Sequence, residues 1–156
     1  MIVRALLLVL SLSAFVTSPN FAHADKLKTA VNPDHLMDTT QFGYSQATVV
    51  SPSAKVIYIA GQIGIKDDGP NDFESQVDRA FDNLVSVLKA AGGRVEDIVK
   101  ITLLIKDHDD KKLQYLVKKR RKVFGKNPPA STLIPVLSLA FESIKFEIDA
   151  IAVTSQ

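Results

Sequence analysis

The sequence of 156 residues contains no cysteine. This absence excludes disulfide bonds, thiolate metal sites, a cysteine nucleophile and a lipid-anchored N-terminal cysteine. The sequence also lacks a large excess of charge of one sign, since its formal net charge is +2. Neither a nucleic acid nor a membrane surface is therefore an expected partner. Glycine and proline number seven each and 46% of the residues are hydrophobic, which excludes a collagen-like or disordered chain and is typical of one ordinary domain.

The first 24 residues have the pattern of a secretory signal peptide. They carry one charge, Arg4, followed by an apolar stretch over residues 5–16, and they end in Ala-His-Ala at positions 22–24. A basic start, an apolar middle and small residues at the cleavage site are typical of export signals. The apolar stretch is shorter than the about 20 residues that a membrane span needs. We therefore expect cleavage after Ala24 and a periplasmic or secreted protein.

The remaining sequence predicts an N-terminal arm over residues 25–43 and one folded domain over residues 44–156. The arm is polar, irregular and interrupted by Pro33. In the domain, short apolar and β-branched runs alternate with helical patterns. The expected order is β-β-α-β-α-β-β, with strands over residues 46–51, 55–60, 98–105, 132–139 and 145–153 and helices over residues 71–91 and 109–124.

Both predicted helices are amphipathic. Asn71 and Glu74 resemble a capping box at the start of the first helix. The apolar residues of this helix fall on one face: Val77, Ala80, Phe81, Leu84, Val85, Leu88 and Ala91. Those of the second helix are Leu113, Leu116, Val117, Val123 and Phe124. Each helix is therefore expected to pack one side against a sheet.

The last two predicted strands define the sheet further. Pro135 fits an edge position better than a central strand, and residues 145–153 alternate between apolar and charged side chains. This pattern favours an α+β fold, with one mixed sheet and both helices packed on a single face. Ile151 and Val153 keep the opposite face apolar, so we expect a subunit interface to cover it.

Several short motifs along residues 40–153 form a specific set by their order and spacing, although each is weak alone. They are Gly43-Tyr44-Ser45-Gln46, Gly61-Gln62-Ile63, Gln76 with Asp82-Asn83-Leu84, Ala90-Ala91-Gly92-Gly93, VEDIVKIT over residues 95–102, Pro129-Ala130-Ser131-Thr132, and FEIDAIAV over residues 146–153. By these motifs, taken together, the chain resembles the RidA family, which is also called the YjgF or L-PSP family.

The resemblance implies a chorismate-mutase-like α+β subunit that forms a homotrimer, with small-molecule clefts between the subunits. It also implies hydrolysis of reactive enamines and imines to a keto acid and ammonia, with no metal and no cofactor. Such chemistry needs a guanidinium that holds the substrate carboxylate. It also needs a water, oriented by a carboxylate, that attacks the C=N carbon.

Three residues match the site of the family. Glu147 corresponds to the acidic residue of the last strand that helps to place the water, and Tyr44 to a tyrosine near the cleft. Gly61 corresponds to the glycine whose backbone N–H contacts the ligand. The resemblance therefore implies Glu147 and Tyr44 as catalytic residues and Gly61 as a substrate-binding residue.

Three other positions depart from the family. Ser131 follows Pro-Ala directly, where deaminating members carry an arginine, Ala60 replaces a serine, and Val117 replaces a ligand-side asparagine of some members. We expect Ser131 and Ala60 to line the cleft. Losing a bidentate arginine costs about two orders of magnitude in carboxylate affinity. The usual 2-imino acid deaminase activity is therefore not expected.

Some features leave alternatives open. Another arginine, Arg79, Arg94, Arg120 or Arg121, can supply the guanidinium from a neighbouring subunit. The basic run over residues 118–122 is expected to be a solvated helix face, since aromatic interleaving is lacking. His35 and His108 lie in the arm and in a loop without paired ligands, so no metal site is expected.

Three functions are compatible with the sequence. The first is a cleft that binds an uncharged or non-carboxylate small molecule without the standard deaminase activity. The second is an enamine or imine deaminase, or a related C–N hydrolase, that uses Glu147 and a bound water. The third is an interaction or holdase-like trimer whose surface matters more than its clefts.

Overall fold

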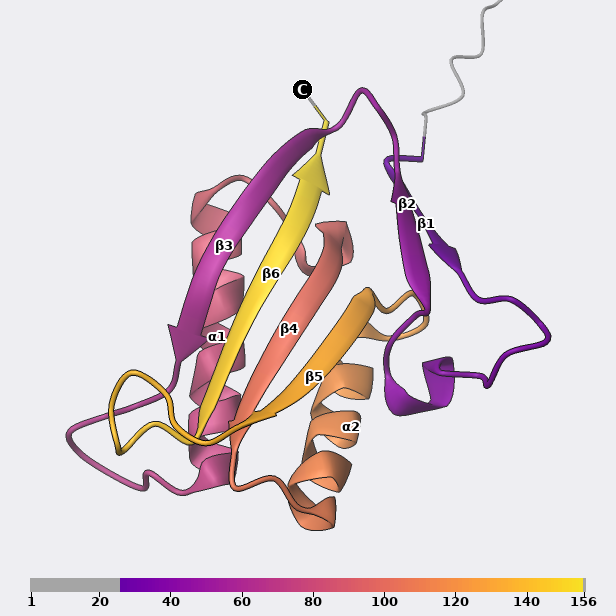
Figure 1. Cartoon of the computed structure of the whole chain (residues 1–156). Coiled ribbons are helices and arrows are strands. Elements are labelled where there is room, and N and C mark those ends of the chain that lie inside the picture. The colour runs from indigo at the N-terminus through magenta and orange to yellow at the C-terminus, as the bar shows by residue number, and fades with distance from the viewer. Residues whose placement is uncertain (1–25, 156) are drawn as a thin grey trace, which may run out of the picture.

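Figure 1 shows the protein as a computed structural model, which describes residues 26–155. The predicted signal peptide lies outside these residues. The elements are β1 (Lys28–Val31), η1 (Thr40–Phe42), β2 (Ala47–Val50), β3 (Lys55–Ile63), α1 (Phe73–Ala90), η2 (Val95–Asp97), β4 (Ile98–Lys106), α2 (Asp110–Phe124), β5 (Ala130–Val136) and β6 (Phe146–Thr154). Within the described part of the chain, no helix combines the length and the apolar character that a membrane crossing requires.

The main sheet has the strand order β3-β6-β4-β5. β6 runs antiparallel to both of its neighbours, whereas β4 and β5 are parallel. Both helices lie on the same side of this sheet, behind it in the view of Figure 1. The predicted α+β fold with two helices on one face of a mixed sheet is therefore confirmed, and Pro135 lies on the edge strand β5, where a missing N–H is tolerated.

The first predicted strand does not join this sheet. The sequence predicted a single sheet that included residues 46–51, but β2 pairs antiparallel with β1, from the arm, in a separate two-stranded sheet. The register runs from Lys28 opposite Val50 to Val31 opposite Ala47. A turn after β2, in which the Ala54 N–H donates to Ser51 O at 3.1 Å, leads into β3. The arm therefore supplies the partner that the sequence pattern could not identify.

The start of α1 also differs from the expected capping box. Asp72 is the N-cap, and its carboxylate accepts a hydrogen bond from Ser75 N at 2.9 Å. The Asn71 Oδ1 instead accepts a hydrogen bond from Lys66 N of the preceding loop at 3.1 Å and one from Arg79 Nη2 of α1 at 2.9 Å. A carboxylate is a strong N-cap because it also interacts favourably with the helix dipole.

The hydrophobic core lies between the helices and the sheet. Phe146 of β6 is fully buried and packs edge-on against Phe73, with ring centroids 6.0 Å apart, and parallel to Phe81 at 6.1 Å. The predicted inward residues of α1 that are buried are Val77, Ala80, Phe81, Leu84 and Leu88. Val85 is only half-buried and Ala91, after the end of the helix, is exposed.

A buried glutamine connects α1 to the β5–β6 loop. Gln76 is inaccessible to solvent. Its Nε2 donates to Ser143 O at 2.8 Å and to Asn71 O at 3.1 Å, while its Oε1 accepts from Lys145 N at 2.8 Å. These bonds fix the loop that leads into β6, the strand that carries Glu147.

Replacing Gln76 with alanine is expected to lower the free energy of unfolding by about 3 kcal/mol, because three hydrogen bonds are lost and their buried partners stay unsatisfied. Urea unfolding at fixed protein concentration measures this change. The exposed Gln114 on α2 offers a matched control, for which we expect a change within about 0.5 kcal/mol. Equal effects of the two substitutions would contradict the anchoring role of Gln76.

Candidate functional site

The structure divides the sequence-predicted site residues into two groups on opposite faces of the main sheet. Ser131 of β5 is opposite Ile101 of β4, which is fully buried on the helix side. Glu147 of β6 is opposite Leu104, three residues farther along β4, on the other face. Since side chains alternate across a strand, the sheet separates Ser131 from Glu147 within one subunit.

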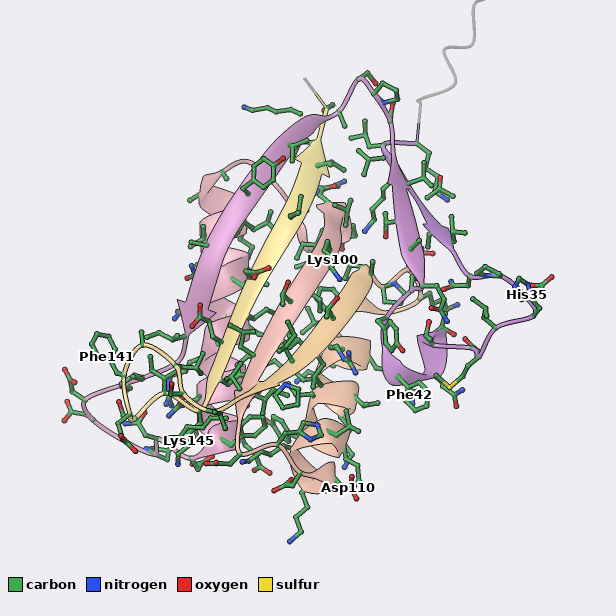
Figure 2. All side chains as sticks on the ribbon, viewed as in Figure 1. His35, Phe42, Lys100, Asp110, Phe141 and Lys145 are labelled. Atoms are coloured by element: carbon green, nitrogen blue, oxygen red, sulfur yellow. The ribbon has the colours of Figure 1, made fainter. Side chains whose placement is uncertain are left out.

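The first group lies on the helix side, between the η1 segment, α2 and β5. A cavity of about 310 Å³ there is lined by both Tyr44 and Ser131. Phe42, at the end of η1 (Figure 2), also lines this cavity. The other lining residues are His108, Leu113, Val117, Arg120 and Leu133. The structure therefore brings Tyr44, Ser131 and Val117 to one cavity.

Arg120 of α2 points into the same cavity and is only 3% exposed. Its Nη1 lies 3.4 Å from Ser131 Oγ, and its guanidinium carbon lies 5.4 Å from the centre of the Tyr44 ring. Its Nε is buried and has no hydrogen-bond partner. Burial lowers the pKa of Arg120, and the interaction with Tyr44 opposes this shift. An arginine nevertheless stays charged at neutral pH.

The sequence contained a signal for Arg120 that its basic surroundings concealed. Arg120 lies four residues after Leu116 and three after Val117, so it belongs to the apolar stripe of the helix and not to the solvated face. The predicted solvated face is therefore wrong for Arg120, which is buried, whereas Lys118 and Lys122 are exposed and Lys119 is half-buried. The helical spacing, and not the local charge, determines which basic side chain enters the cavity.

Gly43 allows the η1 segment to approach α2 closely. Its φ is +76°, and a Cβ at this position would lie 2.9 Å from Arg120 Cβ and 3.0 Å from Arg121 N. An L-residue is disfavoured at this φ, and the contact with the helix backbone leaves no room for it. The following residue, Tyr44, is thereby placed with its ring near the guanidinium.

The second group lies on the opposite face, where β3 has a bulge. The register of β3 with β6 shifts between Ile59 and Gln62, so that Ala60 and Gly61 form the irregular part of the strand. A Cβ on Gly61 would lie 1.8 Å from Glu147 Oε1. The absence of a side chain at position 61 therefore makes room for the carboxylate. Ala60 and Gly61 are exposed and Glu147 is half-buried, so the group is open to solvent.

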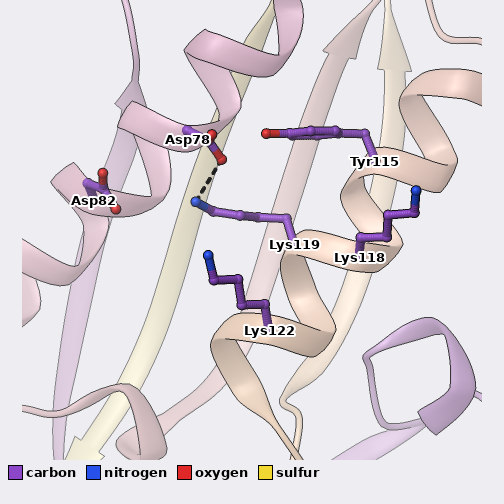
Figure 3. A pocket seen from close by; sticks show the side chains of 6 residues that line it. All are labelled: Asp78, Asp82, Tyr115, Lys118, Lys119 and Lys122. Atoms are coloured by element: carbon purple, nitrogen blue, oxygen red, sulfur yellow. Dashed lines mark hydrogen bonds and ion pairs between the residues drawn. The ribbon is translucent and has the colours of Figure 1, made fainter.

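Another pocket, between the two helices, contains a surface ion pair. Lys119 Nζ donates to Asp78 Oδ1 at 2.8 Å, and Tyr115 points toward the same carboxylate (Figure 3). Desolvation and the Asp78 carboxylate raise the pKa of Tyr115 to about 12. Lys118 and Lys122 complete a partly exposed basic rim. This pocket contains none of the predicted site residues.

In residues 26–155 no group of three or more His, Asp or Glu residues is arranged to hold a metal ion. His108 lies at the cavity of Tyr44, whereas His35 lies in the exposed arm (Figure 2).

Comparison with known proteins places the chain in one group. The family model described as Endoribonuclease L-PSP matches residues 38–154. The 2-iminobutanoate/2-iminopropanoate deaminase of Rattus norvegicus is 35% identical over 114 residues, covering 70% of this chain and 79% of the rat protein. The structure of the Rid family protein YyfB from Yersinia pestis, of unknown function, has a TM-score of 0.77 at 26% identity, covering 82% of this chain and 99% of that one. The structure of TdcF from Escherichia coli with bound serine has a TM-score of 0.56 at 28% identity, covering 72% and 88%.

Proposed function

Because the chain belongs to the Endoribonuclease L-PSP family, which includes the RidA and YjgF proteins, we propose that it hydrolyses small enamines or imines in clefts between the subunits of a homotrimer. The observation that carries this proposal is the division of the site residues between two faces of one sheet. A cyclic trimer joins two different surfaces at each interface. The cavity of one subunit then meets the Gly61–Glu147 face of the next.

The open face of the sheet supports a subunit interface. Its exposed apolar side chains include Val56 at 42%, Tyr58 at 80% and Ile134 at 41% relative exposure. Large apolar side chains exposed on one face of a sheet favour burial of that face against a partner. A second copy of the chain is the partner that also completes the site, since it brings its own cavity of Tyr44 and Ser131.

The chemistry follows from the residues of the two groups. Glu147 orients a water molecule and accepts its proton as the oxygen adds to the C=N carbon. This proton passes to the nitrogen and gives a carbinolamine. The hydroxyl proton of the carbinolamine then also moves to the nitrogen as the C=O bond forms and the C–N bond breaks, so an imine plus water becomes a carbonyl compound plus ammonia. This step needs no redox partner. General acid–base catalysis of this kind contributes about 10²–10⁴-fold to the rate.

Binding without turnover is a second candidate, favoured by the residues at two positions. Ser131 and Ala60 replace the arginine and the serine of deaminating family members. In this case the clefts hold a small molecule but leave its C–N bond intact. The rat relative is named as a deaminase of 2-imino acids, which fits the first candidate. The TdcF structure contains the amino acid serine, which fits binding of a small molecule.

The experiment uses the full-length gene product, expressed in an exporting bacterium and purified as processed there. Intact mass tests the proposed cleavage after Ala24, and light scattering tests the trimer. Imino acids are generated in situ by an amino-acid oxidase, and their loss is compared with a buffer blank. Hydrolysis well above the blank supports the deaminase. A rate equal to the blank, with binding retained, supports the second candidate. A monomer would overturn the shared cleft.

Replacing Gly61 with alanine tests the contact with Glu147. The new Cβ displaces the end of a flexible side chain, so we expect the free energy of unfolding to change by less than about 1 kcal/mol. Misplacing the carboxylate by about 1 Å is expected to lower kcat for imine hydrolysis by about 100-fold. Unchanged kcat in a folded Gly61→Ala trimer would show that Glu147 does not act from this position.

A further inference from the structure

Arg120 is a buried cation without an anion. It is 3% exposed, and no ion pair in the described part of the chain involves it. Its hydrogen bond to Ser131 Oγ is long, at 3.4 Å, and its Nε has no partner. Buried charges are normally paired or fully hydrogen-bonded, because their desolvation is costly. The guanidinium therefore has unused donors inside the cavity.

Two polar groups of the cavity, the Arg120 guanidinium and Ser131 Oγ, lie next to each other. His108 and Tyr44 add polar atoms to the wall, and the other lining side chains are apolar. Ser131 Oγ and the guanidinium share the cavity of about 310 Å³. Phe42, Leu113 and Val117 contribute apolar side chains to it. A planar guanidinium binds a carboxylate through two parallel hydrogen bonds. This combination fits a small carboxylate with an apolar substituent better than a neutral polar molecule.

The small side chain of Ser131 explains how Arg120 is accommodated. A guanidinium already lies 3.4 Å from Ser131 Oγ, so an arginine at position 131 would place a second cation against the first. The serine leaves this space free and adds a neutral donor beside the guanidinium.

We propose that Arg120, projecting from α2 of its own subunit, is the carboxylate receptor of the cleft. This inference rests on the proposed small-molecule cleft and names the residue that holds the carboxylate of its ligand. Arg120 of α2 thereby takes the role for which β5 offers no arginine.

The test compares 2-oxobutanoate with its uncharged methyl ester as probes, using calorimetry on the full protein. The parent is expected to bind 2-oxobutanoate at least about tenfold more tightly than the ester. Arg120→Gln is expected to weaken 2-oxobutanoate binding by about 100-fold, corresponding to the loss of a bidentate charged contact, and to leave ester binding unchanged. The neighbouring exposed Arg121→Gln is the matched control, with no expected change.

A relocated guanidinium provides the second variant. Arg120→Gln combined with Ser131→Arg is expected to bind 2-oxobutanoate with at least about a tenth of the affinity of the parent. Equal affinity of the parent for the acid and the ester, or of Arg120→Gln and the parent for the acid, would overturn the receptor assignment while leaving the cleft intact. The comparison of acid and ester needs only the parent protein, so it tests the receptor assignment even if Arg120→Gln fails to fold. Binding of neither probe by the parent would overturn the proposed function together with this inference.

Discussion

Replacing Glu147 with glutamine is expected to lower kcat for imine hydrolysis by about 10²–10⁴-fold. Glutamine keeps the shape of the side chain and still fits beside Gly61, but its neutral amide cannot accept the proton of the attacking water. KM should change little, because the proposed carboxylate receptor, Arg120, lies on the other face of the sheet and joins the cleft from a second subunit. The split between kcat and KM therefore separates a chemical role from a binding role.

The measurement is steady-state hydrolysis of imino acids generated in situ, with trimer content checked in each preparation. Glu74, exposed in the first turn of α1, is the matched control, and its substitution by glutamine should leave kcat within about twofold of the parent. A fully active Glu147→Gln trimer would show that another group activates the water.

The second large effect is expected in the core. Truncating Phe146 to alanine removes a fully buried ring and its contacts with Phe73 and Phe81. Large-to-small changes of a buried phenylalanine cost about 3–5 kcal/mol, and most domains have only about 5–15 kcal/mol in total. We therefore expect the free energy of unfolding to fall by about half in an average domain of this size.

Chemical unfolding at a fixed protein concentration measures this loss, since dissociation of an oligomer is linked to unfolding. Val87, 41% exposed on the outer side of α1, serves as the control, and its change to alanine should cost less than about 1 kcal/mol. A similar cost for both variants would mean that the packing of the three phenylalanines does not dominate the core.

The sequence predicted the parts of the fold that depend on local periodicity. The 3.6-residue pattern identified Val77, Leu84 and Leu88 as buried positions of α1, and the alternation along residues 145–153 identified the inward face of β6. It could not identify strand partners, because the pattern of β2 is equally compatible with the main sheet and with the arm. The pairing of β1 with β2 is determined by tertiary contacts and not by the local sequence pattern.

The site was predictable to a similar extent. The motifs indicated Tyr44, Ser131, Gly61 and Glu147, but they could not show that the sheet separates the first two from the last two. That separation follows from the register of β4 with β5 and with β6. A bulge of one extra residue at Ala60–Gly61 also alters the register of β3 with β6. Arg120 was one of several open alternatives, expected from a neighbouring subunit. Its position became clear only when the helix was placed against β5.

Mixing two impaired variants, assayed at a substrate concentration well below KM of Arg120→Gln, tests most directly whether the cleft is shared between subunits. Arg120→Gln and Glu147→Gln chains, carrying different tags, are co-expressed and the mixed trimers are purified through both tags. If each cleft takes Arg120 from one subunit and Glu147 from the next, every mixed trimer contains one intact cleft, and about a third of the parent activity returns. Trimers of either variant alone serve as controls. Mixed trimers that hydrolyse imines no faster than these controls would contradict a site built from two subunits.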